Sequence, residues 1–118
     1  MKKLAFTLGG ILILIGVSLA APADRSFTGE IMDSACASMG SHSGMMSKEG
    51  GPKTAKACTA ACVKGGAKYV LYDSATKKTY QLDDQSKPEQ FAGEKVKVVG
   101  TYDATSKTIH VTSITSAS

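Results

Sequence analysis

The feature that most constrains the fold of this chain is its first segment, which has the three parts of a secretory signal peptide. Two lysines precede an apolar stretch, and the small residues Ala21-Pro22-Ala23 follow it. A signal peptide is removed on export and takes no part in the folded domain. We therefore expect cleavage of residues 1–23 and an exported domain of residues 24–118, in the periplasm or outside the cell. Cleavage after Ala20 is the alternative, and an uncleaved anchor is less favoured because glycines interrupt the apolar stretch.

The charge of the expected domain gives no strong signal for nucleic-acid binding. The chain has 14 basic side chains, two of them in the signal peptide, and 10 acidic ones, all in the domain. Nucleic-acid binding needs a clustered basic face, whereas the lysines from Lys48 to Lys107 are spread singly or in pairs among acids. We interpret them as a solvated surface. The sequence names no partner, and membrane contact is expected only through the signal peptide before cleavage.

Four β-prone segments dominate the second half of the chain. They are rich in β-branched and aromatic residues and are joined in pairs by polar linkers that begin at Asp73 and Asp103. Such segments separated by short turns predict hairpins, and Asp, Ser and Thr favour turns because they bond nearby backbone. We therefore expect two β-hairpins, with strands at 69–72 and 79–82 and at 96–102 and 109–114.

Two further elements complete the predicted fold. Residues 27–32 alternate between apolar and polar positions, which predicts a strand. Residues 88–93 suit a short helix, because proline favours a first helical turn and glycine ends helices. Five strands with a helix between the third and the fourth are the order of an OB-type barrel. We expect a mainly β fold, a small five-stranded OB-like barrel, with Val96 and Val98 inside and a bulge at Gly100.

Residues 36–66 form an insert between the first and second predicted strands. Residues 36–51 are rich in Ser, Gly and Met without periodicity, which predicts an irregular loop. A helix is expected after this loop, because Thr54 can cap its start, alanines and lysines favour it, and Gly65-Gly66 can end it. The insert carries all three cysteines. A domain of this size often needs a staple such as a disulfide or a metal.

A Gly-x-Ile-x-Asp-Ser-x-Cys motif spans Gly29 to Cys36, and the pair Cys58 and Cys62 follows it. With a second half that runs from Phe91 to Tyr102 and on through Ile109-His110-Val111, the chain resembles a family of small exported bacterial proteins of unknown function. The resemblance covers most of the mature chain. It implies export and an OB-like C-terminal half, and it carries over no catalytic residue.

Three cysteines and one histidine of the insert form a candidate metal site. Three sulfurs and one imidazole are a complete tetrahedral set for zinc, and two of the cysteines lie four residues apart on one face of the expected helix. Met39, Met45 and Met46 suit copper(I) equally, because thiolates and thioethers favour soft ions, although plain loop surface is at least as good an interpretation for them. The candidate ligands are Cys36, His42, Cys58 and Cys62.

A disulfide is the alternative for the same cysteines, because thiols of exported proteins normally oxidise. Cys36 with Cys58 or Cys62 is the better bridge, since thiols side by side on a helix do not converge. One thiol is then left over for a metal, a partner or a redox role. The corresponding functions are a disulfide-stapled binding module for an unidentified partner and, as a third alternative, a thiol redox protein.

Enzyme motifs are missing, so we expect a non-enzymatic module. The sequence has no zinc-protease, nucleophile-elbow or phosphate-loop motif. Asp83-Asp84 fits a turn or cap, and His110 fits a solvated strand position. With no Trp and four Tyr, surfaces on which an oligonucleotide or oligosaccharide could stack are few. The preferred function is an exported OB-like module that binds zinc or copper through its Cys/His cluster.

Overall fold

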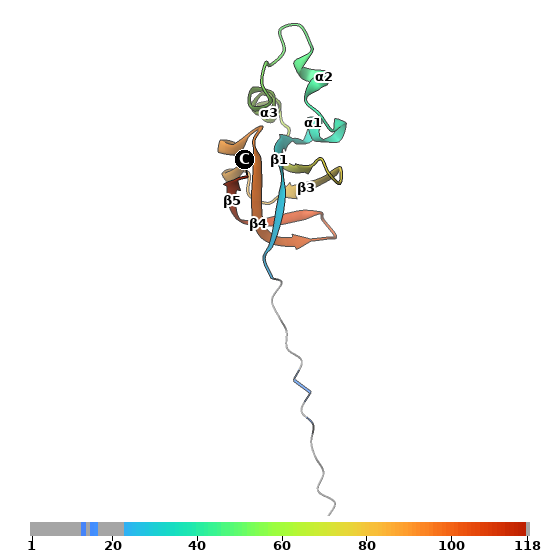
Figure 1. The fold of residues 1–118 in the computed structure, drawn as a ribbon, viewed down its shortest axis with the longest axis vertical. Helices are drawn as coiled ribbons and strands as arrows, with labels where there is room; N and C mark the ends of the chain where they lie inside the picture. The colour runs from blue at the N-terminus through green and yellow to red at the C-terminus, as the bar shows by residue number, and fades with distance from the viewer. Residues whose placement is uncertain (1–12, 14, 17–22, 118) are drawn as a thin grey trace, which may run out of the picture.

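The computed structural model describes residues 13, 15–16 and 23–117, so the predicted signal peptide lies mostly outside the described residues. The described chain is mainly β, with five strands and a few short helices (Figure 1). None of its helices is both long and apolar enough to cross a membrane. The strands are β1 (Arg25–Asp33), β2 (Tyr69–Asp73), β3 (Lys78–Leu82), β4 (Lys95–Asp103) and β5 (Thr108–Ser116), and the helices are α1 (Ser34–Met39), α2 (Ser43–Met46), α3 (Ala55–Lys64) and the 3-10 helix η1 (Lys87–Phe91).

The five strands pair into a closed, barrel-like ring. Its order is β1-β2-β3-β5-β4, and antiparallel pairing of β4 with β1 closes it. β3 and β5 run parallel, whereas the other neighbours are antiparallel. Both predicted hairpins are confirmed, one from β2 and β3 and one from β4 and β5. The β4–β5 register shifts between Val99 and Gly100, which confirms the predicted bulge.

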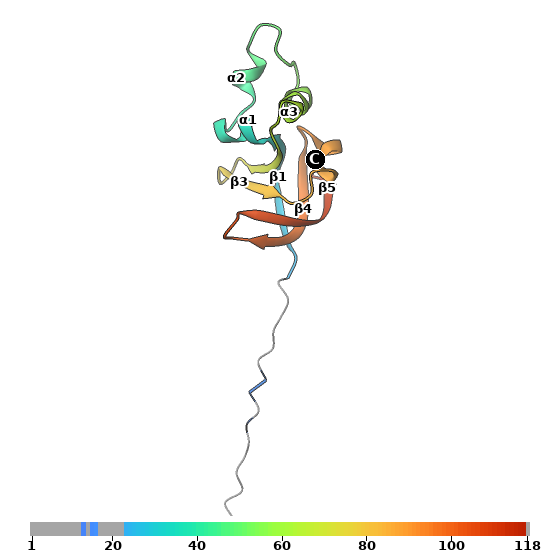
Figure 2. The ribbon, with the colours of Figure 1, turned by 180° about the vertical axis from the view of Figure 1, so that it is seen from behind.

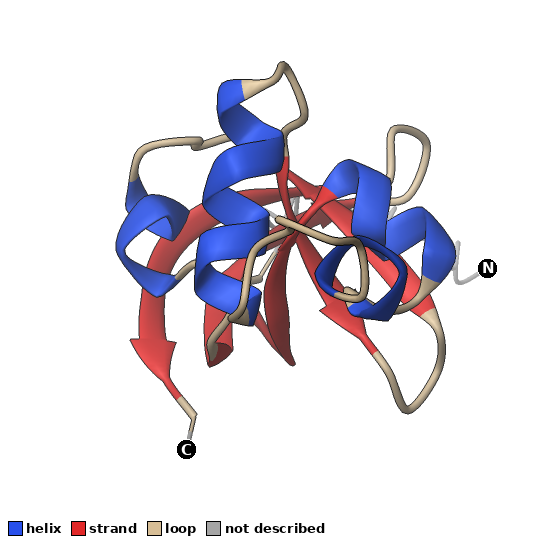
Figure 3. Ribbon diagram, turned by 90° about the horizontal axis from the view of Figure 1, so that it is seen from above, coloured by secondary structure: helices blue, strands red, loops and turns tan. Residues whose placement is uncertain are grey.

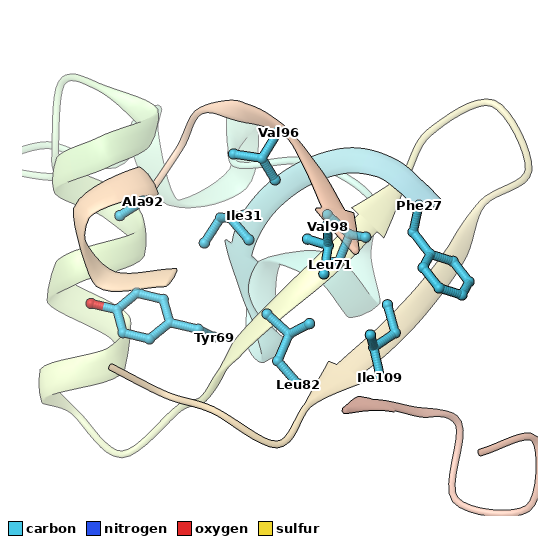
Figure 4. Close-up of a cluster of buried hydrophobic side chains, with 9 residues drawn as sticks. All are labelled: Phe27, Ile31, Tyr69, Leu71, Leu82, Ala92, Val96, Val98 and Ile109. Carbon is cyan, nitrogen blue, oxygen red and sulfur yellow. The ribbon is translucent and has the colours of Figure 1, made fainter. Parts of the chain in front are cut away.

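Side chains from all five strands point toward one another inside the ring and form its core (Figure 4). Because successive side chains of a strand point to opposite faces, β4 buries Val96 and Val98 completely and exposes Lys95 and Lys97. The alternation predicted for this strand is therefore confirmed. The buried members of the core are Phe27, Ile31, Tyr69, Leu71, Leu82, Ala92, Val96, Val98 and Ile109.

The short elements that join the strands are also confirmed. η1 has Pro88 in its first turn and Gly93, at φ 76°, after its end, although its turns are of the 3-10 type. At the two hairpin tips, Asp73 and Asp103 each accept the backbone N–H two residues further on, at 3.0 and 2.9 Å. The Asp side chains therefore fix the turns in the way that the sequence predicts.

The helix predicted in the second half of the insert is confirmed as α3. The Thr54 hydroxyl accepts the Ala57 N–H at 3.1 Å at its start, and Gly65 caps its end. α1, α2 and α3 stand together at one end of the ring (Figures 1, 2 and 3). α1 packs against β1 and β2, and α3 packs against β1. Between them lies a second buried cluster, made of Met32, Cys36, Ala37, Cys58, Val70 and Tyr72.

The prediction of an irregular loop over residues 36–51 is wrong, because α1 and α2 occupy much of it. Local caps explain α1. A carboxylate oxygen of Asp33 accepts the Cys36 N–H at 2.9 Å at its start, and Gly40 ends it in the left-handed conformation at φ 75°. Helices of six and four residues are too short to show the 3.6-residue hydrophobic period on which the prediction relied.

Gly100→Ala is expected to lower the free energy of unfolding by about 1–3 kcal/mol, the usual range for forcing extra atoms into a packed site. A Cβ at this position would overlap the backbone oxygen of His110 on β5. Chemical denaturation measures the change. Gly44→Ala is the control, because a Cβ there meets nothing within 4 Å. Equal stability of the two variants would show that the bulge does not depend on glycine.

Candidate metal centre

Four buried side chains converge where β1 meets the helices. Asp33 ends β1, Cys36 lies in α1, His42 precedes α2 and Cys58 lies in α3. Each offers one possible ligand atom, and these atoms all lie within 4.8 Å of one another. Asp33, Cys36 and Cys58 are fully buried, and His42 is 9% exposed. These four residues could hold a metal ion, and we call them the metal centre for short.

Asp33 enters the centre through the oxygen that its capping role leaves free. Its Oδ2 accepts the Cys36 N–H at 2.9 Å and so fixes the start of α1. Its Oδ1 is buried and has no hydrogen-bond partner in the part of the chain that the structure describes. Since a buried polar atom without a partner is destabilising, this oxygen is available for a further bond inside the centre.

His42 is held by one ring nitrogen and leaves the other free. Its Nε2 lies 2.9 Å from Oε2 of Glu30, a half-buried side chain of β1. Its Nδ1 is buried without a partner among the described residues. In metalloproteins a carboxylate commonly fixes the orientation of a ligating histidine in this way, through the nitrogen that does not bind the metal. The arrangement leaves Nδ1 as the atom of His42 that could bind a metal.

The two thiols of the centre are close but not bonded. The sulfurs of Cys36 and Cys58 lie 3.8 Å apart, whereas a disulfide bond is about 2.05 Å long, and both cysteines are free. Burial raises the pKa of the Cys36 thiol above its ordinary value, and the hydrogen bond to Cys58 and the charge of Asp33 raise it further. Without a metal, Cys36 is therefore a neutral thiol at physiological pH.

The structure brings together three of the four candidate ligands that the sequence indicated, namely Cys36, His42 and Cys58. The fourth, Cys62, is partly exposed and lies beside the centre: burial raises the pKa of its thiol, and so do the charges of Asp33 and Cys58. The sequence reasoning missed Asp33. A sequence signal for its position existed, because Asp33 lies three residues before Cys36, which is the spacing between an N-cap residue and the N–H that it accepts.

The other residues that the sequence singled out lie around the centre or away from it. Met45 and Met46 are partly buried and pack against the second cluster, whereas Met39 is 57% exposed. His110 is exposed, lies 3.2 Å from Asp83 and is not among the four converging residues. Asp84 accepts the N–H groups of two following residues, which confirms the turn predicted there.

A cavity of about 610 Å³ adjoins the centre on one side. His42 is the only member of the metal centre among the described residues that line this cavity, and Glu30 and Met32 line it beside the imidazole. Tyr72 and Lys95 lie among its other lining residues. The cavity connects the imidazole end of the centre to solvent.

Comparison of the chain with protein families, with curated proteins and with solved structures finds no match. The chemistry of the centre itself therefore carries the information on function. Its donors are one carboxylate oxygen, one imidazole nitrogen and two thiol sulfurs, which are the three ligand types that zinc takes from proteins.

Proposed function

We propose that the protein is an exported, non-enzymatic module that binds one zinc ion through Asp33, Cys36, His42 and Cys58. One observation carries the proposal: Asp33 Oδ1 and His42 Nδ1 are buried without partners among the described residues, in a group completed by two free thiols. Leaving such atoms unpaired costs free energy. A bound cation would satisfy both of them and would stabilise the fold.

The mixture of donors favours zinc over other metals. Magnesium and calcium prefer oxygen ligands alone, and copper(I) prefers sulfur. Zinc accepts oxygen, nitrogen and sulfur in a tetrahedral set. Four protein donors fill that set and leave no open position for a substrate, which supports a structural role for the metal and a non-enzymatic function.

The position of the centre supports a role as a staple. It joins the end of β1 to α1, to the link before α2 and to α3, so that a metal there would hold the insert on the ring.

We include an OB-like assignment of the ring in the proposal, because its strand order and the place of η1 between β3 and β4 fit that fold. Export rests on residues 1–23, and zinc would protect the thiols from oxidation outside the cytoplasm.

Metal analysis together with thiol counting tests the proposal. The protein is purified from its own compartment, its metal is measured by elemental analysis, and free thiols are counted under denaturing conditions with and without a chelator. We expect about one zinc per chain and three titratable thiols. Copper in place of zinc would refute the metal assignment. A chain without metal and with one thiol would refute the centre and identify a disulfide between two of the cysteines.

Glu30→Gln is expected to weaken zinc binding by about 10–100-fold, the usual effect of removing the carboxylate that orients a ligating histidine. The amide can still bond Nε2 but does not strengthen the imidazole as a ligand. A competition titration against a chromophoric chelator measures the change. Glu49→Gln is the control, because Glu49 is exposed. Equal affinities of the two variants would exclude the Glu30–His42 pair from metal binding.

A further inference from the structure

A second site lies on the ring, between its two hairpins. A hollow of about 490 Å³ opens between β3 and the β4–β5 hairpin, within the range of small-molecule sites, which is about 300–1,000 Å³. The tips of both hairpins extend to the same side of the ring (Figure 1). They bring Lys77 and Lys78 of one hairpin to the same hollow as Lys107 of the other, so that lysines far apart in the sequence form one cluster.

The hollow is positively charged. No acidic residue appears among the described residues that line it. Asp73 and Asp103, at the two hairpin tips, accept backbone N–H groups of their own turns. Asp83, two residues after Gln81, accepts the Val111 N–H at 2.9 Å and lies 3.2 Å from His110. The guanidinium of Arg25 adds a further positive charge beside the hollow, where it lies 5.7 Å from the ring centre of Tyr102, one of the lining residues.

Two of these lysines have a backbone conformation that lysine rarely adopts. Lys77 and Lys107 have φ angles of 56° and 54°, in the left-handed region, which costs a residue with a side chain roughly 1–2 kcal/mol and which glycine or asparagine adopts more readily. A lysine with positive φ occurs in both hairpins, and both of these lysines line the hollow. Strain of this kind is often retained where a side chain has a function.

Aromatic rings form one wall of the hollow. Tyr80 and Tyr102 line it, and their rings pack edge to face with centres 5.5 Å apart. Both pack on Phe27, with ring centres 5.1 and 5.8 Å away. The two tyrosine rings are therefore fixed in place and offer apolar surface next to the lysine cluster. A ligand with a negative charge and a flat ring matches this combination.

We propose that the hollow binds a nucleoside phosphate unit, either as a free nucleotide or within single-stranded nucleic acid. Lysine binds phosphate as a point charge, and an acidic sugar lacks the flat aromatic base that the tyrosine wall matches. The tyrosines can stack on a base. The concave shape favours a compact ligand over a flat membrane surface. This site is independent of the metal centre, so the failure of either proposal leaves the other in place.

The test uses the double variant Lys77→Asn/Lys107→Asn, which removes two charges and suits the left-handed backbone. Binding of a fluorescent single-stranded oligothymidylate is measured by anisotropy at two salt concentrations, with a nucleoside monophosphate, inorganic phosphate and an oligouronate as competitors. We expect the double variant to bind about tenfold more weakly or worse, with an unchanged or higher unfolding temperature. Lys97→Asn, on β4 outside the hollow, is the control.

Each possible result of this experiment either supports or overturns the proposal. Competition by the mononucleotide supports a free nucleotide as the ligand, and binding of the oligonucleotide alone supports single-stranded nucleic acid. Stronger competition by the oligouronate than by either nucleotide form would overturn the proposal in favour of an acidic sugar. Equal competition by inorganic phosphate and the mononucleotide, equal loss of affinity in Lys97→Asn and in the double variant, or no binding at low salt would overturn it as well.

Discussion

Cys58→Ala is expected to abolish zinc binding and to cost the zinc-loaded protein about 4 kcal/mol of unfolding free energy when free zinc is about 1,000 times Kd. Cys58 supplies one of four donors and is fully buried between α3 and β1. Alanine removes the sulfur but keeps a small apolar side chain, so the packing of the second cluster changes little. Most of the lost stability is therefore the binding free energy of the metal.

Denaturation with zinc and with a chelator measures this effect and separates it from packing. In the chelator, wild type and Cys58→Ala should differ by less than they do in zinc. Cys62→Ala is the matched control, because Cys62 lies on the same helix, one turn further on, and outside the four converging residues. If Cys62→Ala loses zinc and Asp33→Asn keeps it, the centre uses three cysteines and a histidine, the set that the sequence suggested.

The parts of the fold that depend on local signals could be predicted from the sequence. The hairpins follow from β-prone segments around Asp73 and Asp103, and α3 follows from a capping Thr54 and a closing Gly65. Gly100 stands out because it interrupts an alternating strand. Each of these signals acts within a few residues of the chain, where propensity and turn chemistry decide the structure.

The composition of the metal centre depends on tertiary placement and could be predicted only in part. Spacing on a helix put Cys58 and Cys62 on one face, but the docking of α3 against β1 places Cys58 in the centre and leaves Cys62 partly exposed. Asp33 serves as a cap with one oxygen and faces the centre with the other. The sequence pattern alone shows the first role, and only the packing shows the second.

The lysine cluster also depends on tertiary placement and could not be predicted from the sequence pattern. Along the sequence, Lys77 and Lys107 lie 30 positions apart with several acids between them, and this pattern indicates a solvated surface. The parallel pairing of β3 with β5 brings the two hairpins side by side. This pairing joins strands that are not consecutive, so no local signal predicts it.

A change of pH is expected to act with opposite sign on the metal-free and the zinc-loaded protein. In the metal-free protein, burial holds the pKa of the Cys36 thiol above its ordinary value of 9.0. Below pH 9 the thiol is protonated in both the folded and the unfolded protein, so its contribution to the free energy of unfolding is fully present. Above pH 9 the unfolded chain loses this proton while the folded chain keeps it, so stability falls by up to about 1.4 kcal/mol per pH unit.

Zinc binding reverses the sign because the metal needs a thiolate. Binding displaces the Cys36 proton, so between pH 6 and 8 the affinity should rise at least about tenfold per pH unit. Denaturant unfolding in chelator from pH 8 to 10 measures the first effect, and zinc titration from pH 6 to 8 measures the second. Cys36→Ala should remove the part of the stability loss above pH 9 that the Cys36 thiol causes. An affinity independent of pH would mean that no thiol proton leaves on binding, and Cys36 would then not be a ligand.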